Sequence, residues 1–132
     1  MQNNMERFLF IIREDLAKLG KRSEEERYDV IREMDIWVKS LVKKRIYEGG
    51  DALRIEGTYI SKNKVVSDGP FIEAKEGISG FIIVDANDLA DATSIAQTCP
   101  LVHSGQMAIE VRQLMGVKDI RELGDAPRAT GG

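Results

Sequence analysis

The strongest candidates for chemistry in this sequence are one carboxylate and one imidazole. Asp68 begins an Asp-Gly-Pro-Phe turn, and His103 is the only histidine in the chain. A neutral imidazole accepts a proton near physiological pH, and a carboxylate bonded to its other nitrogen fixes its tautomer and orientation. Such a pair would abstract a proton from a small polar or aromatic substrate, and elimination or isomerisation would follow. Asp68 and His103 are therefore the predicted catalytic residues.

Residues near the same turn are candidates for holding a ligand. Pro70 fixes its own φ and keeps the preceding residue out of the helical region, so the chain runs extended into Phe71. The Lys75 ammonium would stabilise an anionic oxygen. Farther upstream, the adjacent residues Gly49 and Gly50 either leave room for a ligand against the backbone or form a β-bulge. These five residues are the predicted ligand contacts.

An ordinary structural role is the competing interpretation of these side chains. A turn aspartate commonly accepts hydrogen bonds from nearby backbone amides, and a loop histidine is commonly solvated. The sequence therefore leaves two functions open. One is an enzyme or binding protein for a small organic molecule, and the other is a noncatalytic module.

Composition narrows the class of protein. One histidine and one cysteine give no metal-ligand spacing, and glycine patterns for phosphates or dinucleotides are absent, so we predict no metal and no cofactor. The net charge of −3 disfavours nonspecific nucleic-acid binding. No apolar run reaches the roughly 20 residues that a membrane helix needs. A lone cysteine, Cys99, excludes an internal disulfide and fits a reducing cytosol, which predicts a cytoplasmic protein.

Hydrophobic spacing predicts the elements that must hold the candidate residues in place. Residues 7–13 are apolar on both faces of a strand, as in a central strand that is covered on both sides. Ser23 and Glu26 form a capping box that begins a long amphipathic helix ending near Arg45. Residues 14–22 are polar and are predicted as a loop. The other predicted elements are strands at 46–53, 58–61, 64–67, 80–84 and 106–112, and a second helix with Asn87 as its N-cap that stops at Pro100.

The order of these elements is typical of a ferredoxin-like α+β fold, βαββαβ, with an inserted β-hairpin. Residues 1–115 would form this domain, and residues 116–132 a partly disordered tail with a helical turn near Ile120. Helices on one side of the sheet leave its other face uncovered, although the strands are apolar on both faces. We therefore predict a homodimer that packs sheet against sheet.

Several motifs together resemble the YCII-related family, and in particular its DGPF subgroup. The similarity runs from about Phe8 to Arg112 and rests on the Asp-Gly-Pro-Phe turn, the glycine pair and the closing strand. The strongest matching positions are Gly49, Gly50, Leu53, residues 68–71, Glu73, Lys75, Glu76, Gly80, Cys99, Pro100 and residues 105–112. The resemblance implies a dimeric ferredoxin-like α/β barrel with a cleft near the subunit interface.

The resemblance also implies candidate activities. A His–Asp pair is the site proposed for the broader family, and a few relatives are lyases that act on chlorinated aromatic ring compounds. Some relatives are encoded beside alternative sigma factors, which implies a regulatory setting. Shorter members carry a histidine on the first helix, which this chain lacks, so a His-dependent mechanism here must use His103. A lyase or isomerase with an interface cleft and an accessory module for transcription control both stay open.

Overall fold

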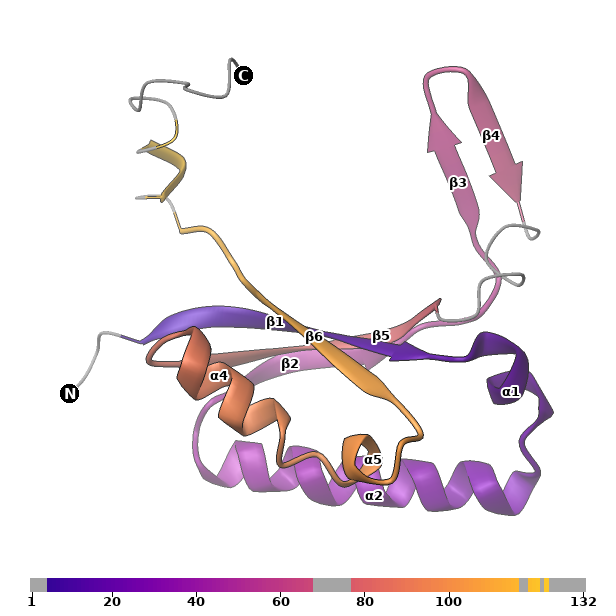
Figure 1. Cartoon of the computed structure of the whole chain (residues 1–132), viewed down its shortest axis with the longest axis horizontal. Coiled ribbons are helices and arrows are strands. Elements are labelled where there is room, and N and C mark those ends of the chain that lie inside the picture. Colours follow the sequence, from indigo (N-terminus) through magenta and orange to yellow (C-terminus); the bar gives the residue numbers. More distant parts are fainter. Residues whose placement is uncertain (1–4, 68–76, 117–118, 122, 124–132) are drawn as a thin grey trace.

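The computed structural model of the chain describes residues 5–67, 77–116, 119–121 and 123. Its main sheet contains the strands β1 (Glu6–Glu14), β2 (Tyr47–Ala52), β5 (Gly77–Ala86) and β6 (Ala108–Gln113). Strands β3 (Thr58–Ser61) and β4 (Lys64–Ser67) form a separate hairpin. The helices are α1 (Leu16–Lys21), α2 (Glu24–Lys43), α4 (Leu89–Ala96) and α5 (Pro100–His103). Figure 1 shows α2, α4 and α5 together on one side of the sheet, with the hairpin rising on the other side.

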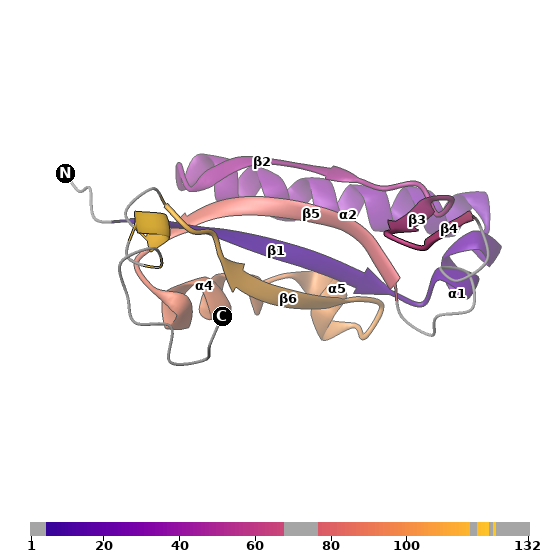
Figure 2. The same ribbon diagram turned by 90° about the horizontal axis from the view of Figure 1, so that it is seen from above.

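The main sheet is antiparallel throughout, and its strand order is β2-β5-β1-β6. Strands β1 and β5, which are the first and third of the βαββαβ pattern, are therefore central, as in a ferredoxin-like fold. Seen from above, α2 lies behind β2 and β5, whereas α4 and α5 lie behind β6 (Figure 2). The predicted α+β class and the order of its elements are confirmed, and the inserted hairpin spans the predicted residues.

Alternation along β1 fixes which face of the sheet meets the helices. Phe8, Phe10 and Ile12 are buried on that face, and the residues between them point to the other face. The Phe10 ring stacks on the Trp37 ring of α2 with centroids 6.4 Å apart. Trp37 Nε1 donates a hydrogen bond of 2.8 Å to Thr98 Oγ1, so its one polar atom is satisfied. Trp37 is thus a packing residue of the core.

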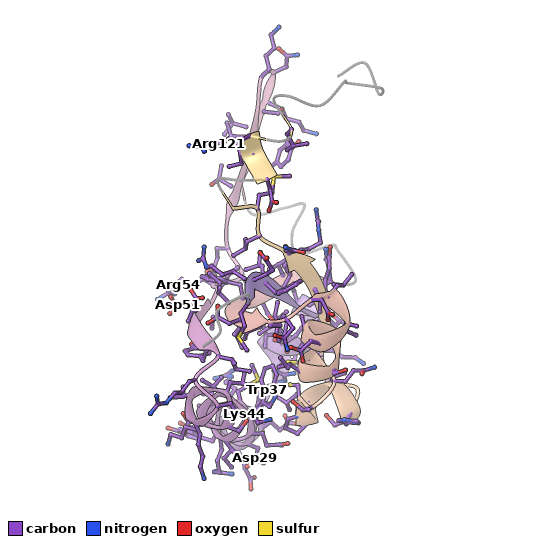
Figure 3. The ribbon with its side chains drawn as sticks, turned by 90° about the vertical axis from the view of Figure 1, so that its left-hand side faces the viewer. Asp29, Trp37, Lys44, Asp51, Arg54 and Arg121 are labelled. Atoms are coloured by element: carbon purple, nitrogen blue, oxygen red, sulfur yellow. The ribbon has the colours of Figure 1, made fainter. Side chains whose placement is uncertain are left out.

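Residues at both ends of helix α2 explain where it begins and where it ends. The Ser23 hydroxyl accepts a hydrogen bond from the Glu26 N–H, and the Glu26 carboxylate accepts one from the Ser23 N–H, which confirms the predicted capping box. Just beyond the helix, Arg45 adopts a positive φ of 63°, which ends the helical path. Figure 3 shows Trp37 on the side of α2 that faces the sheet and Asp29 on the far side. Neither α2 nor any other helix in the described part of the chain is long and apolar enough to span a membrane.

The prediction of a loop at residues 14–22 is wrong, because α1 lies within this segment. The Asp15 carboxylate accepts hydrogen bonds from the backbone N–H groups of Ala17 and Lys18 at 3.0 and 3.2 Å, which caps the helix. Leu16 is buried and ties α1 to the domain. One buried residue in so short a helix leaves no periodic pattern for sequence reasoning to detect.

The boundaries predicted for the second helix are also wrong. Its N-cap is Asp88 rather than Asn87, because the Asp88 carboxylate accepts a hydrogen bond of 2.8 Å from the Asp91 N–H. Helix α4 ends at Ala96, and Pro100 begins the next helix, α5, instead of stopping α4. Proline suits the first turn of a helix, where its missing N–H has no partner to lose.

The glycine pair in β2 has a structural explanation. The pairing of β2 with β5 shifts by one residue between Tyr47 and Gly49, which forms a bulge, and Gly49 has a φ of 154°. A Cβ atom at Gly50 would overlap the Phe81 carbonyl oxygen of β5 and would lie 3.0 Å from Ile82 Cα. The two glycines therefore allow the bulge and the close approach of β2 to β5.

Gly50→Ala should lower the free energy of unfolding by about 1–3 kcal/mol, because the added methyl group collides with the backbone of β5. Gly57→Ala is the matched control, because a Cβ atom there has no heavy atom within 4 Å. Urea denaturation of both variants measures the difference. Equal stability of the two variants would show that the strands do not approach closely at Gly50.

The sheet face opposite the helices, called the open face below, has an apolar centre. Leu9 and Ile11 of β1 pair in register with Ile83 and Phe81 of β5, and all four side chains are only partly buried. The predicted apolar character of both sheet faces is therefore present, and α2, α4 and α5 cover only the face opposite to this one (Figure 1).

The segment after β6 contains the predicted helical turn. Residues 119–121 are helical, and the Ile120 N–H donates a hydrogen bond of 3.1 Å to the Gly116 carbonyl. The last residues of the predicted tail, 124–132, lie outside the described residues.

Candidate functional site

A buried carboxylate stands at the end of the central strand β1. Glu14 is only 7 % exposed, and both of its carboxylate oxygens are engaged. Oε1 accepts a hydrogen bond of 3.0 Å from Arg22 Nη2, and Oε2 accepts one of 2.5 Å from Ser79 Oγ. A buried charge is tolerated only when it is paired and hydrogen-bonded, and this arrangement satisfies both conditions.

Three different elements position this cluster, which we call the Glu14 cluster (Glu14, Arg22 and Ser79). Glu14 is the last residue of β1, Ser79 lies on the neighbouring strand β5, and Arg22 is the C-cap of α1. A Cβ atom at Gly77 would overlap the Leu16 side chain, so the start of β5 packs closely against α1. The close packing of α1 on the end of the sheet therefore brings Arg22 to Glu14.

The Glu14 cluster forms part of the wall of a cleft between α2 and the β5–β2 edge of the sheet. This cavity, called the apolar cleft below, has a volume of about 470 Å³. Most of its lining is hydrophobic and includes Ile12, Val30, Met34, Val38, Ile82 and Met107. Small-molecule sites are typically clefts of roughly 300–1,000 Å³ with apolar walls and a few placed polar groups. The apolar cleft fits that description.

A second cavity, called the basic cleft below, lies on the other side of the Glu14 cluster. Its volume is about 670 Å³, and it opens between α1 and the loop that leads from α5 into β6. Its lining includes the cationic side chains of Arg13, Lys18 and Lys21. Glu14, Arg22 and Met107 line both cavities, so these residues separate them.

The predicted catalytic residues cannot be paired from the described part of the chain. His103 is the last residue of α5, is exposed, and lines neither cleft. Asp68 lies outside the described residues, and so do the predicted ligand contacts Pro70, Phe71 and Lys75. The pairing of Asp68 with His103 stays a prediction.

The other two predicted ligand contacts, Gly49 and Gly50, are placed on the edge strand β2. Neither of them lines the apolar cleft or the basic cleft. The following residues Asp51, Ala52 and Leu53 do line the apolar cleft. A role of the two glycines in ligand binding also stays a prediction, and the bulge explains their presence without a ligand.

Sequence reasoning missed the Glu14 cluster, although the sequence contains one sign of it. Phe8, Phe10 and Ile12 face the core, and Glu14 continues this alternation onto the same face. A carboxylate at a core-facing position is uncommon and indicates a paired or functional group. The predicted strand ends at residue 13, and the predicted loop begins at Glu14. The prediction therefore does not treat Glu14 as a residue of the strand.

Cys99 is buried and precedes α5 rather than ending a helix. Burial raises the pKa of its thiol, although the hydrogen bonds from the backbone of Val102 and Leu101 act in the opposite direction. A thiol with a raised pKa is a poor nucleophile. Burial therefore makes Cys99 an unreactive thiol.

A pair of carboxylates, Glu48 and Asp85, lies on the open face. Arg7 Nε donates a hydrogen bond of 3.1 Å to Glu48 Oε1, and Asp85 stands directly across from Arg7 in the sheet register. Burial and the hydrogen bond with Glu48 raise the pKa of Asp85 from 3.8 to about 6. The hydrogen bond from Asp85 and the Arg7 guanidinium lower the pKa of Glu48. The two carboxylates therefore share a proton over part of the acidic range.

The raised pKa of Asp85 predicts how stability depends on pH. Between pH 3.8 and about 6 the folded protein keeps a proton on Asp85 that the unfolded chain has released, so stability falls as the pH rises through this window. Asp85→Asn should remove this loss and stabilise the protein at pH 7 by on the order of 1 kcal/mol, after allowance for solvent screening.

Denaturation of wild type and Asp85→Asn at a series of pH values between 4 and 7 tests this prediction. Glu48→Gln should flatten the same part of the curve, because it removes the charge that repels the ionised Asp85. Parallel curves for all three proteins would exclude a shared proton at this pair.

Comparison with known proteins identifies a family whose model matches most of this chain. A family model described as the YCII-related domain matches residues 7–115. This span begins in β1 and continues past the end of β6, so it contains both clefts and the open face. A search of curated proteins finds no match.

Proposed function

The chain belongs to the YCII-related family, and we propose that it binds a small organic molecule in the apolar cleft. One observation carries this proposal: a hydrophobic cavity of about 470 Å³ has in its wall a buried carboxylate that is hydrogen-bonded to a partly buried guanidinium. Apolar walls provide most of the binding free energy, and a few fixed polar groups orient the ligand. Met34 and Met107 add adaptable surface, because an unbranched thioether can fit ligands of several shapes.

A neutral apolar probe tests the proposal without any contribution from ligand charge. We expect 4-phenyl-1-butanol to bind wild type, and Val38→Phe to weaken binding by about tenfold or more, because the larger side chain fills the cleft. Ile36→Phe is the matched control, since Ile36 is exposed on the other side of the same helix. Isothermal titration calorimetry measures each affinity. Equal affinity of the two variants would contradict binding in the apolar cleft.

The reaction that we propose is proton abstraction followed by elimination or isomerisation, with Asp68 and His103 as the acid–base pair. His103 lines neither cleft, but the loop that follows it reaches the basic cleft at Gly105, and this nearness supports the proposal. Exchange of ligand protons with deuterated solvent, followed by NMR, would report the step. His103→Gln should abolish the exchange and leave binding intact. Binding without exchange in wild type would favour the noncatalytic alternative, an accessory module for transcription control.

A second copy of the chain is the partner that we propose for the open face. Its apolar centre is formed by Leu9, Ile11, Phe81 and Ile83. Apolar sheet faces are normally covered by another layer, and the helices α2, α4 and α5 lie on the opposite face. A symmetric dimer would cover both open faces with one contact.

The charges around this centre support pairing with a copy of itself. The half formed by β2 and β5 carries the acidic residues Glu48, Asp51 and Asp85, whereas the half formed by β1 and β6 carries Arg7, Arg13 and Arg112, with Glu110 as its acid. A two-fold axis along the strands, between β5 and β1, would place the acidic half of one copy over the basic half of the other. Complementary charges of this kind favour one orientation over others.

Two further assignments complete the proposal. We place the chain in the DGPF subgroup on its Asp-Gly-Pro-Phe sequence at residues 68–71, which lies outside the described residues. We also place the protein in the cytoplasm, because its single cysteine is a buried, free thiol, which suits a reducing compartment.

A further inference from the structure

The apolar cleft and the basic cleft adjoin each other. Glu14, Arg22 and Met107 line both cavities, so a single layer of side chains stands between them. A molecule that fills the apolar cleft as far as this layer would bring its end group next to the basic cleft. The chemistry of the basic cleft therefore determines which end group is favoured.

The carboxylates of the basic cleft are already committed to partners within the protein. Glu14 accepts hydrogen bonds from Arg22 and Ser79, and Asp15 caps α1 through the backbone N–H groups of its first turn. Glu26 closes the capping box of α2. Glu14 thus has both of its carboxylate oxygens engaged, whereas Asp15 and Glu26 each use one oxygen to cap a helix.

The cations of the basic cleft are not all committed. Arg13 pairs with Glu110 at 2.9 Å, but no ion pair in the described part of the chain includes Lys18 or Lys21. Arg22 uses one N–H group for Glu14, and a guanidinium has five N–H donors. The lining contains four cationic side chains and three carboxylates, so the cleft carries a small excess of positive charge, which suits an anion.

We propose that the ligand of this protein is an amphipathic organic anion. Its aliphatic or aromatic body occupies the apolar cleft, and its carboxylate or similar anionic group reaches past the Glu14 cluster to Lys18 and Lys21. Arg22 lies at the boundary, where it holds Glu14 on one side and faces the anionic group on the other. This inference rests on the proposed function, because it requires that the apolar cleft binds the body of the ligand.

Two probes with the same carbon skeleton test the charge preference. We expect 4-phenylbutyrate to bind wild type about tenfold more tightly than 4-phenyl-1-butanol at low ionic strength, because charge-assisted hydrogen bonds are the stronger kind. The ratio of the two affinities should shrink as salt is added. In the double variant Lys18→Gln with Lys21→Gln, the ratio should fall to near one while the affinity for the alcohol is unchanged.

Two matched variants separate a local contact from the effect of total charge. Lys43→Gln with Lys44→Gln removes the same charge from the far end of α2 and should keep the wild-type ratio. Lys18→Arg with Lys21→Arg keeps the charge in the cleft and should also keep the ratio. If the double glutamine variant does not fold, each single variant should show about a threefold loss in the ratio.

The outcomes distinguish the inferred preference for an anion from the proposed binding of a ligand in the apolar cleft. If the alcohol binds and the acid binds no better, the apolar cleft is a ligand site but the ligand is not an anion, and the inference is wrong. A tenfold preference that survives the loss of both Lys18 and Lys21 would also overturn it. If neither probe binds, the proposed function fails, and the inference fails with it.

Discussion

Glu14→Ala is expected to lower the free energy of unfolding by about 3–5 kcal/mol, which is the largest loss that we predict for an ionic side chain. The substitution leaves the guanidinium of Arg22 without its partner, although the Arg22 side chain is only 15 % exposed. It also leaves the Ser79 hydroxyl, which is 7 % exposed, without its acceptor. The hydroxyl would remain buried and unsatisfied, and the partly buried guanidinium would lose its carboxylate partner. Urea denaturation monitored by tryptophan fluorescence measures the loss through Trp37.

The control for this prediction is Glu56→Ala, which removes an exposed loop carboxylate and should change stability by less than about 0.5 kcal/mol. A double-mutant cycle isolates the ion pair itself. Glu14→Leu and Arg22→Met should each destabilise the protein, whereas the double variant should lose less than the sum of the two, because no buried charge is left unpaired. Additive losses would show that Glu14 and Arg22 do not interact.

Ile11→Asp is expected to convert the proposed dimer into a folded monomer. Ile11 lies at the apolar centre of the open face, and the two-fold symmetry of the proposed dimer introduces two carboxylates into one interface. An unpaired carboxylate is costly in an apolar contact, so dimer dissociation should become easier by roughly 100-fold or more. Sedimentation velocity at micromolar protein concentration measures the change.

The matched control for the dimer is Ile36→Asp, which places the same charge on the exposed side of α2. This variant should sediment as wild type does. Circular dichroism should show that Ile11→Asp keeps its secondary structure, because the helix-covered core does not include Ile11. A wild-type protein that sediments as a monomer would rule out the dimer that we propose.

The sequence predicted those parts of the fold that depend on local signals. The capping box of Ser23 and Glu26 forms from residues three positions apart, and the hairpin formed by β3 and β4 follows from two short β-prone runs around a tight turn. The central position of β1 follows from its unbroken apolar run. Each of these features can be recognised without knowledge of any distant residue.

The candidate site could not be predicted in the same way, because it is assembled from distant parts of the chain. Glu14, Arg22 and Ser79 meet only after α1 packs against the end of the sheet. Nothing in the local sequence of Ser79 or Arg22 distinguishes them from ordinary surface residues. The sequence predicts Asp68 and His103 from their chemical type and local motif, and residue type alone does not place a side chain beside a cavity.

The most direct test of small-molecule binding in the apolar cleft uses the methyl groups of methionine. The chain has five methionines, of which Met34 and Met107 line the apolar cleft, whereas Met5 and Met115 are 47 % and 59 % exposed outside it. Methyl NMR during titration with 4-phenyl-1-butanol should show saturable shifts for Met34 and Met107 and none for Met5 or Met115. Saturable shifts at Met5 or Met115 with Met34 and Met107 unchanged, or no shifts at any methionine, would contradict the proposed site.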